Sequence, residues 1–369
     1  MILPYANNLP VHKLAAIFNN TTNSYKYYWF LSLLENIKTN NTGEILLEDI
    51  IIEMISEVWF PVNCFKLSFG KQDQFARLIK DLLNYLNYPK HLKKEALKLI
   101  LIKDKKNVIV KELIIEFSRY VPYRFLSSFY LSELRGVIDA RKNEMIIKLS
   151  SQNFENEVNG GLYKFTSKNS IIINPVWRDY LFNNLNILHG FTYWNLSLYL
   201  QKNNPNVPNI QEKLFPPGVR DLSVAKKFWQ AYFEIKLQAK CIYSDISLFK
   251  GNYSLDHYLP WSFTAHDRLW NILPTPQKIN SSKSDHLPSE IYLNKFVTLQ
   301  FDAIQTVTQN QKIKINALED YTVLFKDSLT NIVNLTAVQF GDTLSNNLRP
   351  LMQIAANMGF SRDWTFTAK

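Results

Sequence analysis

Apolar side chains recur every three or four residues through much of this chain, which is the period of a helix with one buried face. Residues 24–37 show the pattern clearly, with Tyr27, Phe30, Leu31 and Leu34 on one stripe. Residues 46–58 and 74–86 repeat it. The pattern therefore predicts that the first 150 residues are helical, and that their aromatic side chains belong to the core.

The pattern changes at residues 151–175, where a Gly-Gly pair and a β-branched run ending in proline predict a strand or hairpin. Helical periods return at 176–200 and 223–240, on either side of a connector rich in proline and asparagine. Helices are also expected at 290–309 and 317–338. We predict a mainly α protein, α+β overall. Its expected parts are a helical region (1–150), a mixed connector region (151–240), a small finger (241–290) and a helical C-terminal region packing on the finger (291–369).

Positive charge is concentrated in the first part of the chain. The net charge is +10, and residues 1–240 carry all of the surplus, with 31 Lys and Arg against 21 Asp and Glu. A basic surface favours polyanions, because each phosphate contact releases counterions. Charge alone leaves two alternatives open, nucleic-acid binding and an ordinary solvated surface.

The strongest basic run is residues 90–113, with eight lysines and three acidic residues. It fits a cradle for a phosphate backbone equally well as an exposed helix face followed by a strand. The candidate phosphate contacts in it are Lys93, Lys94, Lys105 and Lys106.

Several classes of protein are disfavoured. The chain has neither a GxxxxGK[ST] nor a GxGxxG motif, so nucleotide-driven chemistry is not expected. Its apolar runs are too short for a membrane span, and its first residues do not resemble an export signal. Two cysteines cannot build a disulfide framework, so we expect a cytoplasmic protein.

The segment 255–288 carries the most direct chemical information. It holds His257, His266 and His286, with Asp256 directly before the first of them. Asn271 and Asn280 follow His257 at distances of 14 and 23 residues. We expect Asp256 and His257 at a strand end, residues 271–273 in a second strand, and Asn280 near the first turn of a helix, an order that brings Asp256, His257 and Asn280 together.

These residue types suit metal-assisted hydrolysis of a phosphodiester. Imidazole titrates near neutral pH, so His257 is the candidate general base. The Asp256 carboxylate and the Asn280 amide oxygen suit Mg²⁺ or Mn²⁺. Lys283 lies one helical turn beyond Asn280, where we expect it to touch the phosphate, and Lys278 is a further candidate contact. His266 and His286 are auxiliary candidates, more often surface histidines than ligands.

The blocks DHYLPWS, WNILP and NSSKSDHLP resemble, in this order, the HNH endonucleases. The resemblance covers about fifty residues, from Cys241 to Glu290. It implies a ββα-metal finger that cleaves DNA with a divalent metal, in which Asn271 pins the loop that aims the histidine. Many related fingers carry two C-x-x-C knuckles for a structural zinc, but here Ser244, Pro276 and Ile279 stand at three of the four positions. We therefore predict no structural zinc.

The expected function is a metal-dependent DNA endonuclease, with double-stranded DNA as substrate. The basic helical region indicates a bacterial defence or restriction effector with a regulatory or targeting protein partner and no membrane association. Two alternatives remain: a catalytically silent DNA-binding or scaffold protein of the HNH type, and an RNase.

Overall fold

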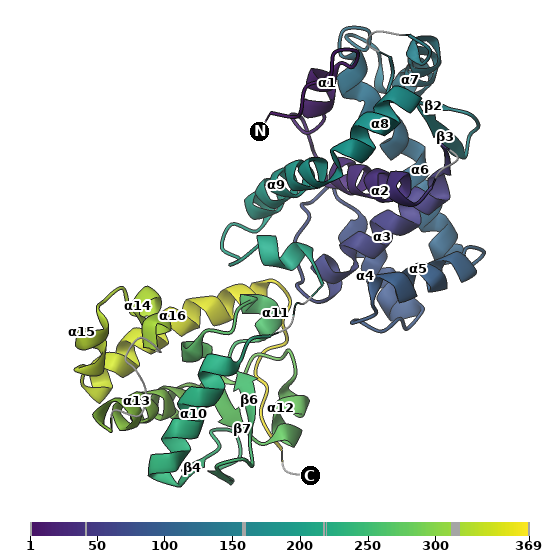
Figure 1. Cartoon of the computed structure of the whole chain (residues 1–369). Helices are drawn as coiled ribbons and strands as arrows, with labels where there is room; N and C mark the ends of the chain where they lie inside the picture. Colours follow the sequence, from purple (N-terminus) through teal and green to yellow (C-terminus); the bar gives the residue numbers. More distant parts are fainter. Residues whose placement is uncertain are drawn as a thin grey trace. The chain divides into compact units, whose positions relative to one another are not determined.

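Helices make up most of both units into which the chain divides (Figure 1). The computed structural model describes residues 2–40, 43–156, 160–216, 218, 220–310 and 318–367. The first unit comprises Met1–Pro205 and Ile210–Pro216, and the second comprises Asn206–Asn209 and Pro217–Lys369. The expectation of a mainly α protein with small sheets is confirmed. Among the described residues, no helix is both long and apolar enough to cross a membrane.

The first unit is built around a central helix, α3, which packs against α2, α4, α5 and α6. Every residue of α3 from Ile50 to Ile55 is buried, because its apolar side chains point in all directions. The α-helices of this unit are α1 (Val11–Ala15), α2 (Tyr25–Thr39), α3 (Leu47–Asn63), α4 (Phe75–Tyr85), α5 (Lys94–Lys103), α6 (Val108–Phe125), α7 (Asp139–Asn153), α8 (Pro175–Asn183) and α9 (Leu185–Asn203). The helices predicted at 24–37, 46–58 and 74–86 correspond to α2, α3 and α4.

A three-stranded antiparallel sheet lies in the same unit. The hairpin predicted within 151–175 is formed by β2 (Tyr163–Phe165) and β3 (Ser170–Ile173), with Tyr163 opposite Ile173. The other edge of β3 pairs with β1 (Glu44–Leu46), where Ile45 lies opposite Ile171. Strand β1 was not predicted, because three residues are too few to show a period.

One of the two alternatives for the lysine run placed a strand at its end, and that strand is wrong. The structure has a helix there, α6, which begins after Asn107. The Asn107 side chain caps this helix by accepting a hydrogen bond from the Ile109 backbone N–H at 2.9 Å. Val110, Leu113 and Phe117 are buried at helical spacing along it. The cap and this stripe outweigh the preference of the β-branched residues 108–110 for a strand.

The described residues of the second unit include two small antiparallel strand pairs, which lie among helices. Its strands and helices are α10 (Ser223–Lys236), β4 (Gln238–Lys240), β5 (Ser247–Phe249), β6 (Ser254–His257), α11 (Trp261–Thr264), β7 (Ile272–Thr275), α12 (Gln277–Lys283), α13 (Leu293–Gln309), α14 (Glu319–Phe325), α15 (Leu329–Val333) and α16 (Ala337–Asn357). Helix α13 packs against both α10 and α16. The helix expected from residue 317 starts outside the described residues, and its described part consists of α14 and α15.

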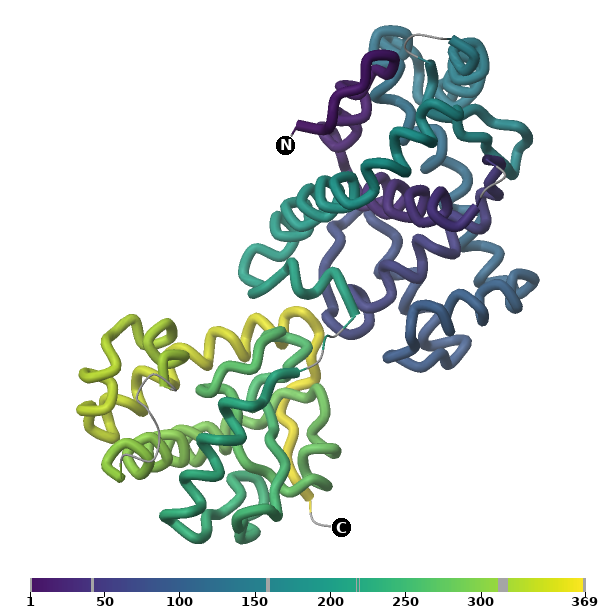
Figure 2. The backbone as a smooth tube through the Cα atoms, viewed as in Figure 1, coloured from purple at the N-terminus to yellow at the C-terminus, as the bar shows by residue number. Residues whose placement is uncertain are grey.

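The end of the chain returns to the finger (Figure 2). The Leu287 backbone N–H donates to the Ser361 carbonyl at 2.8 Å, and the Trp364 N–H donates to the Leu287 carbonyl at 3.0 Å. Pro288 and Trp364 form a parallel bridge. Backbone hydrogen bonds thus join segment 287–289 to segment 361–364. They fix the position of the chain where it leaves the finger.

A buried carboxylate joins α3 to α5 and gives a test of the fold. Glu53 is 4% exposed, and its oxygens lie 2.5 Å from Lys94 Nζ and 2.7 Å from Lys98 Nζ. Burial raises the pKa of Glu53, but the two lysines outweigh this and hold the pKa below its usual value. We predict that Glu53→Gln lowers the free energy of unfolding of the first unit by about 2 kcal/mol at neutral pH, since Lys94 and Lys98 lose the buried carboxylate that they share. Urea denaturation would measure this.

The control is Glu95→Gln on α5, whose side chain is 78% exposed and which should change stability little. Because the pKa of Glu53 is lowered in the folded state, its contribution is present above the unfolded pKa. The contribution disappears as the pH falls through the folded value. Equal stability losses for both variants at neutral pH would contradict the prediction.

Candidate active site

The segment predicted to carry the chemistry forms a hairpin followed by a helix. Strands β6 and β7 are antiparallel, with Asp256 opposite Leu273 and His257 opposite Ile272. Helix α12 begins at Gln277, after β7 ends at Thr275. Successive side chains of a strand point to opposite faces, so Asp256 and His257 have different neighbours. Both residues are 4% exposed.

Asp256 faces α12 and the turn before β5. The Lys283 ammonium lies 3.2 Å from Asp256 Oδ1, and the Tyr243 hydroxyl donates to Oδ2 at 3.3 Å. Burial and the charge of Asp256 raise the pKa of Tyr243 well above its usual value, so the phenol keeps its proton and remains a donor. Both oxygens of the carboxylate therefore have donors from the chain itself.

His257 is held by a second carboxylate. Its Nε2 lies 2.8 Å from Asp267 Oδ1, and an ionised carboxylate only accepts, so Nε2 carries the proton. Burial raises the pKa of Asp267, but the hydrogen bond and charge of His257 outweigh this and lower it, so Asp267 stays ionised. The lone pair of the neutral ring is then on Nδ1, which is the atom that can accept a proton from water.

Asn271 ties the loop that follows His257. This fully buried side chain accepts from the Leu259 N–H at 2.8 Å and donates to the Leu259 carbonyl at 3.0 Å. The backbone carbonyl of Asn271 accepts a hydrogen bond from the Tyr258 N–H at 2.8 Å. These bonds fix the two residues after His257, which is the pinning geometry expected of Asn271. Its contribution to catalysis stays a prediction.

Asn280 lies on α12 and is turned toward β6. Its amide nitrogen donates to the Leu255 carbonyl and to the Ser254 hydroxyl, both at 3.1 Å. These two hydrogen bonds fix the orientation of the Asn280 carboxamide, so its oxygen points away from the two acceptors. Within the described residues this oxygen has no hydrogen bond, so it can serve as a ligand.

The donor set fits a magnesium-type ion. Among the described residues there is no group of three or more His, Cys, Asp or Glu side chains arranged for a metal. Mg²⁺ does not require one, since it binds through one or two carboxylates plus waters and phosphate oxygens. The Asp256 carboxylate and the Asn280 amide oxygen, both anchored on β6, would hold such an ion.

The two auxiliary histidines have structural partners. His266 Nδ1 accepts from the Arg268 N–H at 3.3 Å, and its ring lies 5.2 Å from the Trp270 ring. Burial, together with the charges of Arg268 and His257, lowers the pKa of His266 to about 4, so it is neutral at physiological pH. His286 Nδ1 bonds to the Lys283 carbonyl at 2.7 Å. Their roles as ligands stay untested predictions.

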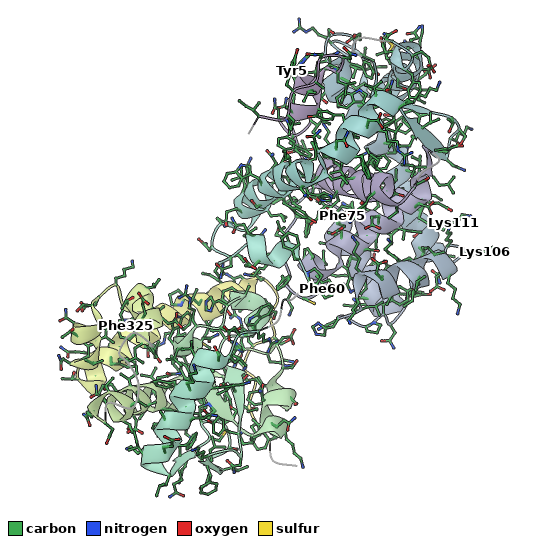
Figure 3. The ribbon with its side chains drawn as sticks, viewed as in Figure 1. Tyr5, Phe60, Phe75, Lys106, Lys111 and Phe325 are labelled. Atoms are coloured by element: carbon green, nitrogen blue, oxygen red, sulfur yellow. The ribbon has the colours of Figure 1, made fainter. Side chains whose placement is uncertain are left out.

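The candidate phosphate contacts divide into paired and exposed lysines. Lys94 pairs with Glu53 and Glu57, and Lys105 with Glu48, so these two charges are used within the first unit. Of the two alternatives for this run, the phosphate cradle therefore loses Lys94 and Lys105 as contacts, because α3 supplies acidic side chains opposite them. Lys93, Lys106 and Lys278 are exposed and remain candidates. Figure 3 shows Lys106 and Lys111 at the edge of the first unit.

Lys283 does not lie where the sequence placed it. It is 0% exposed and donates to the His257 carbonyl at 2.6 Å in addition to Asp256. A buried ammonium cannot touch a phosphate from this position. Lys283 does lie about one helical turn after Asn280, as the spacing predicted. The spacing alone does not show that the Lys283 side chain points into the protein interior.

Three residues of the site were not predicted: Asp267, Tyr243 and Arg220. Asp267 stands next to His266 in the sequence, and only the loop fold brings it to His257 ten residues earlier. Arg220 is exposed, lies 5.2 Å from the centre of the Trp261 ring, and contributes to lowering the pKa of Asp267. The basic character of Arg220 was visible in the sequence, but nothing there linked it to the site.

Backbone hydrogen bonds close the turn at the start of the finger. The Cys241 N–H donates to the Ile246 carbonyl, and the Asp245 N–H donates to the Cys241 carbonyl, both at 2.9 Å. Tyr243 packs edge-on against Tyr292 and Trp364, with ring centres 5.0 and 5.2 Å away. Backbone bonds and aromatic packing thus stabilise this turn.

A hairpin with a histidine at its strand end, followed by a helix bearing asparagine, defines the class of ββα-metal nuclease domains. Residues 241–289 match the family model of the HNH endonucleases, which identifies this segment as an HNH domain. The resemblance stated from the sequence is therefore confirmed. The curated proteins contain no match to the chain, and neither do the solved structures.

The missing knuckle cysteines lead to a prediction about zinc. Cys241 is fully buried, and Ile279, at another knuckle position, is 2% exposed and belongs to the same apolar core. One thiolate is too few for a structural zinc site. We predict that dialysis of the purified protein against a chelator leaves its Tm unchanged, because packing rather than zinc holds the finger. Elemental analysis that found one tightly bound zinc per chain would contradict this.

Proposed function

We propose that this protein is an endonuclease that hydrolyses DNA phosphodiester bonds with Mg²⁺ or Mn²⁺. The match to the HNH endonucleases supports nuclease activity in general. The observation that carries the finer proposal is the joint placement of Asp256, His257 and Asn280, with His257 backed by Asp267 at 2.8 Å. A silent scaffold has no need for an imidazole held by a carboxylate in this way.

The chain's own residues account for the proton transfers. His257 Nδ1 takes a proton from a water as the water oxygen attacks phosphorus, and the bond from phosphorus to the leaving oxygen breaks. The leaving oxygen gains a proton from solvent. Asp267 stabilises the imidazolium that forms, as a carboxylate does for histidine in other hydrolases. A divalent ion held by Asp256 and Asn280 would neutralise charge on the phosphate and the leaving oxygen.

DNA is favoured as the substrate on the resemblance and on charge. The surplus of 31 basic against 21 acidic residues in residues 1–240 favours a polyanion. RNA is the second candidate, since the metal chemistry acts on the phosphate and not on the sugar.

The proposal extends to a role in defence against foreign DNA, with a regulatory or targeting protein as partner. It is supported by a large, basic helical region joined to a nuclease domain that carries no evident specificity module. The genes beside this one would test it. A neighbourhood of unrelated metabolic genes would count against the role without affecting the proposed chemistry.

Nuclease activity is tested with supercoiled plasmid and with single-stranded RNA, each with Mg²⁺, Mn²⁺ or chelator. We predict that the wild type cuts plasmid with either metal and that His257→Ala reduces the rate about 10²- to 10⁴-fold, since the general base is lost. The control is His12→Ala, since His12 is an exposed histidine on α1 of the first unit, and this variant should stay within a few-fold of wild type. Intact plasmid under every metal condition would refute the proposal, and cleavage of RNA alone would favour the RNase.

Asp267 is predicted to position His257. Asp267→Asn keeps the shape but removes the charge that stabilises the imidazolium, so we expect kcat to fall about 10- to 10³-fold with little change in KM. The acid limb of the pH–rate profile should move to lower pH, because the imidazolium loses its carboxylate partner. Asp342→Asn, at an exposed position of α16, is a control with the same charge change. A lower rate with an unmoved pH profile would show that Asp267 only supports the fold.

A further inference from the structure

Lys283 is the most unusual charged residue of the second unit, because an ammonium group is held there with no exposure to solvent. It is the last residue of α12, and its Nζ has two acceptors: Asp256 Oδ1 at 3.2 Å and the His257 carbonyl at 2.6 Å. Burying a charge is costly unless it is paired and hydrogen-bonded. The partners of Lys283 therefore indicate what the residue is for.

The ammonium contacts Oδ1 of Asp256, for which the described residues provide no other donor. The other oxygen, Oδ2, already accepts from the buried Tyr243 hydroxyl. Oδ1 is thus the oxygen that can exchange one cation for another. Asn280 lies three residues before Lys283 on the same helix. Its amide nitrogen is hydrogen-bonded to Ser254 and Leu255 of β6, so its oxygen is available to a ligand.

We propose that Lys283 is an internal counter-ion that holds Asp256 in the metal-free protein and releases Oδ1 when a divalent ion binds. This inference rests on the proposed function, because it assumes that Asp256 is a metal ligand. Lys283 then sets the metal affinity of the site. It keeps the buried carboxylate neutralised and in place before metal arrives, and its positive charge repels the ion that displaces it.

The second acceptor makes this exchange feasible with little movement. The hydrogen bond to the His257 carbonyl is the shorter of the two, so the ammonium can keep this bond while it gives up Oδ1. The displaced Lys283 ammonium then stays hydrogen-bonded to the backbone carbonyl of His257. The proposal differs from a phosphate contact, in which Lys283 would affect substrate binding and leave metal affinity unchanged.

The test is the binding of Mn²⁺ to the full-length, chelator-treated protein without DNA, measured by calorimetry. Lys283→Met removes the charge and keeps the apolar stem in its buried site. We expect Mn²⁺ to bind about tenfold more tightly or better, because one positive charge close to the ion is gone. Without metal the variant should have a lower Tm than wild type, since Asp256 loses its counter-ion, and Mn²⁺ should raise that Tm more than it raises the wild-type value.

Lys278→Met is the matched control. Lys278 lies on the same helix and is exposed, so this variant has the same charge change without the contact to Asp256. Its Mn²⁺ affinity should stay within about twofold of wild type, since exposed charges are screened. An equal gain in both variants would mean that general charge, and not the position of Lys283, sets the affinity, and would overturn the proposal.

Unchanged or weaker Mn²⁺ binding by Lys283→Met would also overturn it. If the variant does not fold without metal, refolding with Mn²⁺ decides: recovery supports the exchange of one cation for the other, and failure refutes it. The proposed function fails separately. A protein that binds Mn²⁺ as expected but never cuts DNA supports the counter-ion and refutes the nuclease, whereas a protein that cuts DNA with unchanged metal affinity does the reverse.

Discussion

The antiparallel pairing of β6 with β7 is the interaction on which the site depends. Its register sets Asp256 and His257 at the end of one strand and brings Asn271 directly before the other. A shift by one residue would exchange the faces of Asp256 and His257 and separate both from their partners. Burial enforces the register, because all four residues of β7 and the last two of β6 are buried.

The support for this hairpin comes mostly from outside the segment that matches the family. Gln300 on α13 donates to the Ile272 carbonyl of β7 at 2.9 Å, and the Tyr321 hydroxyl donates to Gln300 at 2.5 Å. Trp364, near the end of the chain, packs against Tyr243, whose hydroxyl reaches Asp256. The helices α13 and α14 and the returning C-terminal segment therefore support the hairpin through side-chain contacts.

Charge is used in two different ways in the two units. In the first unit the lysines of α5 compensate acids buried on α3, so a sequence that looks like a polyanion cradle is partly an internal ion-pair network. In the second unit the buried pair of Lys283 and Asp256 lies inside the candidate site itself. In both cases low exposure makes the pairing important, because an unpaired charge at these positions would be strongly disfavoured.

The sequence by itself determined the helices with a clear apolar period, the hairpin within 151–175, the extent of the HNH domain and the residue types of its site. These features depend on local spacing, which is written in the order of residues. It could not determine β1, whose three residues show no period, or the strand-like run 108–110, which a cap and a buried stripe turn into a helix. Only the tertiary structure decided that Asp267 supports His257, that Tyr243 holds Asp256 and that Lys283 faces inward. Each of these contacts joins residues 10 to 27 positions apart across a loop, and the direction of a side chain at such a place depends on packing from elements distant in the sequence.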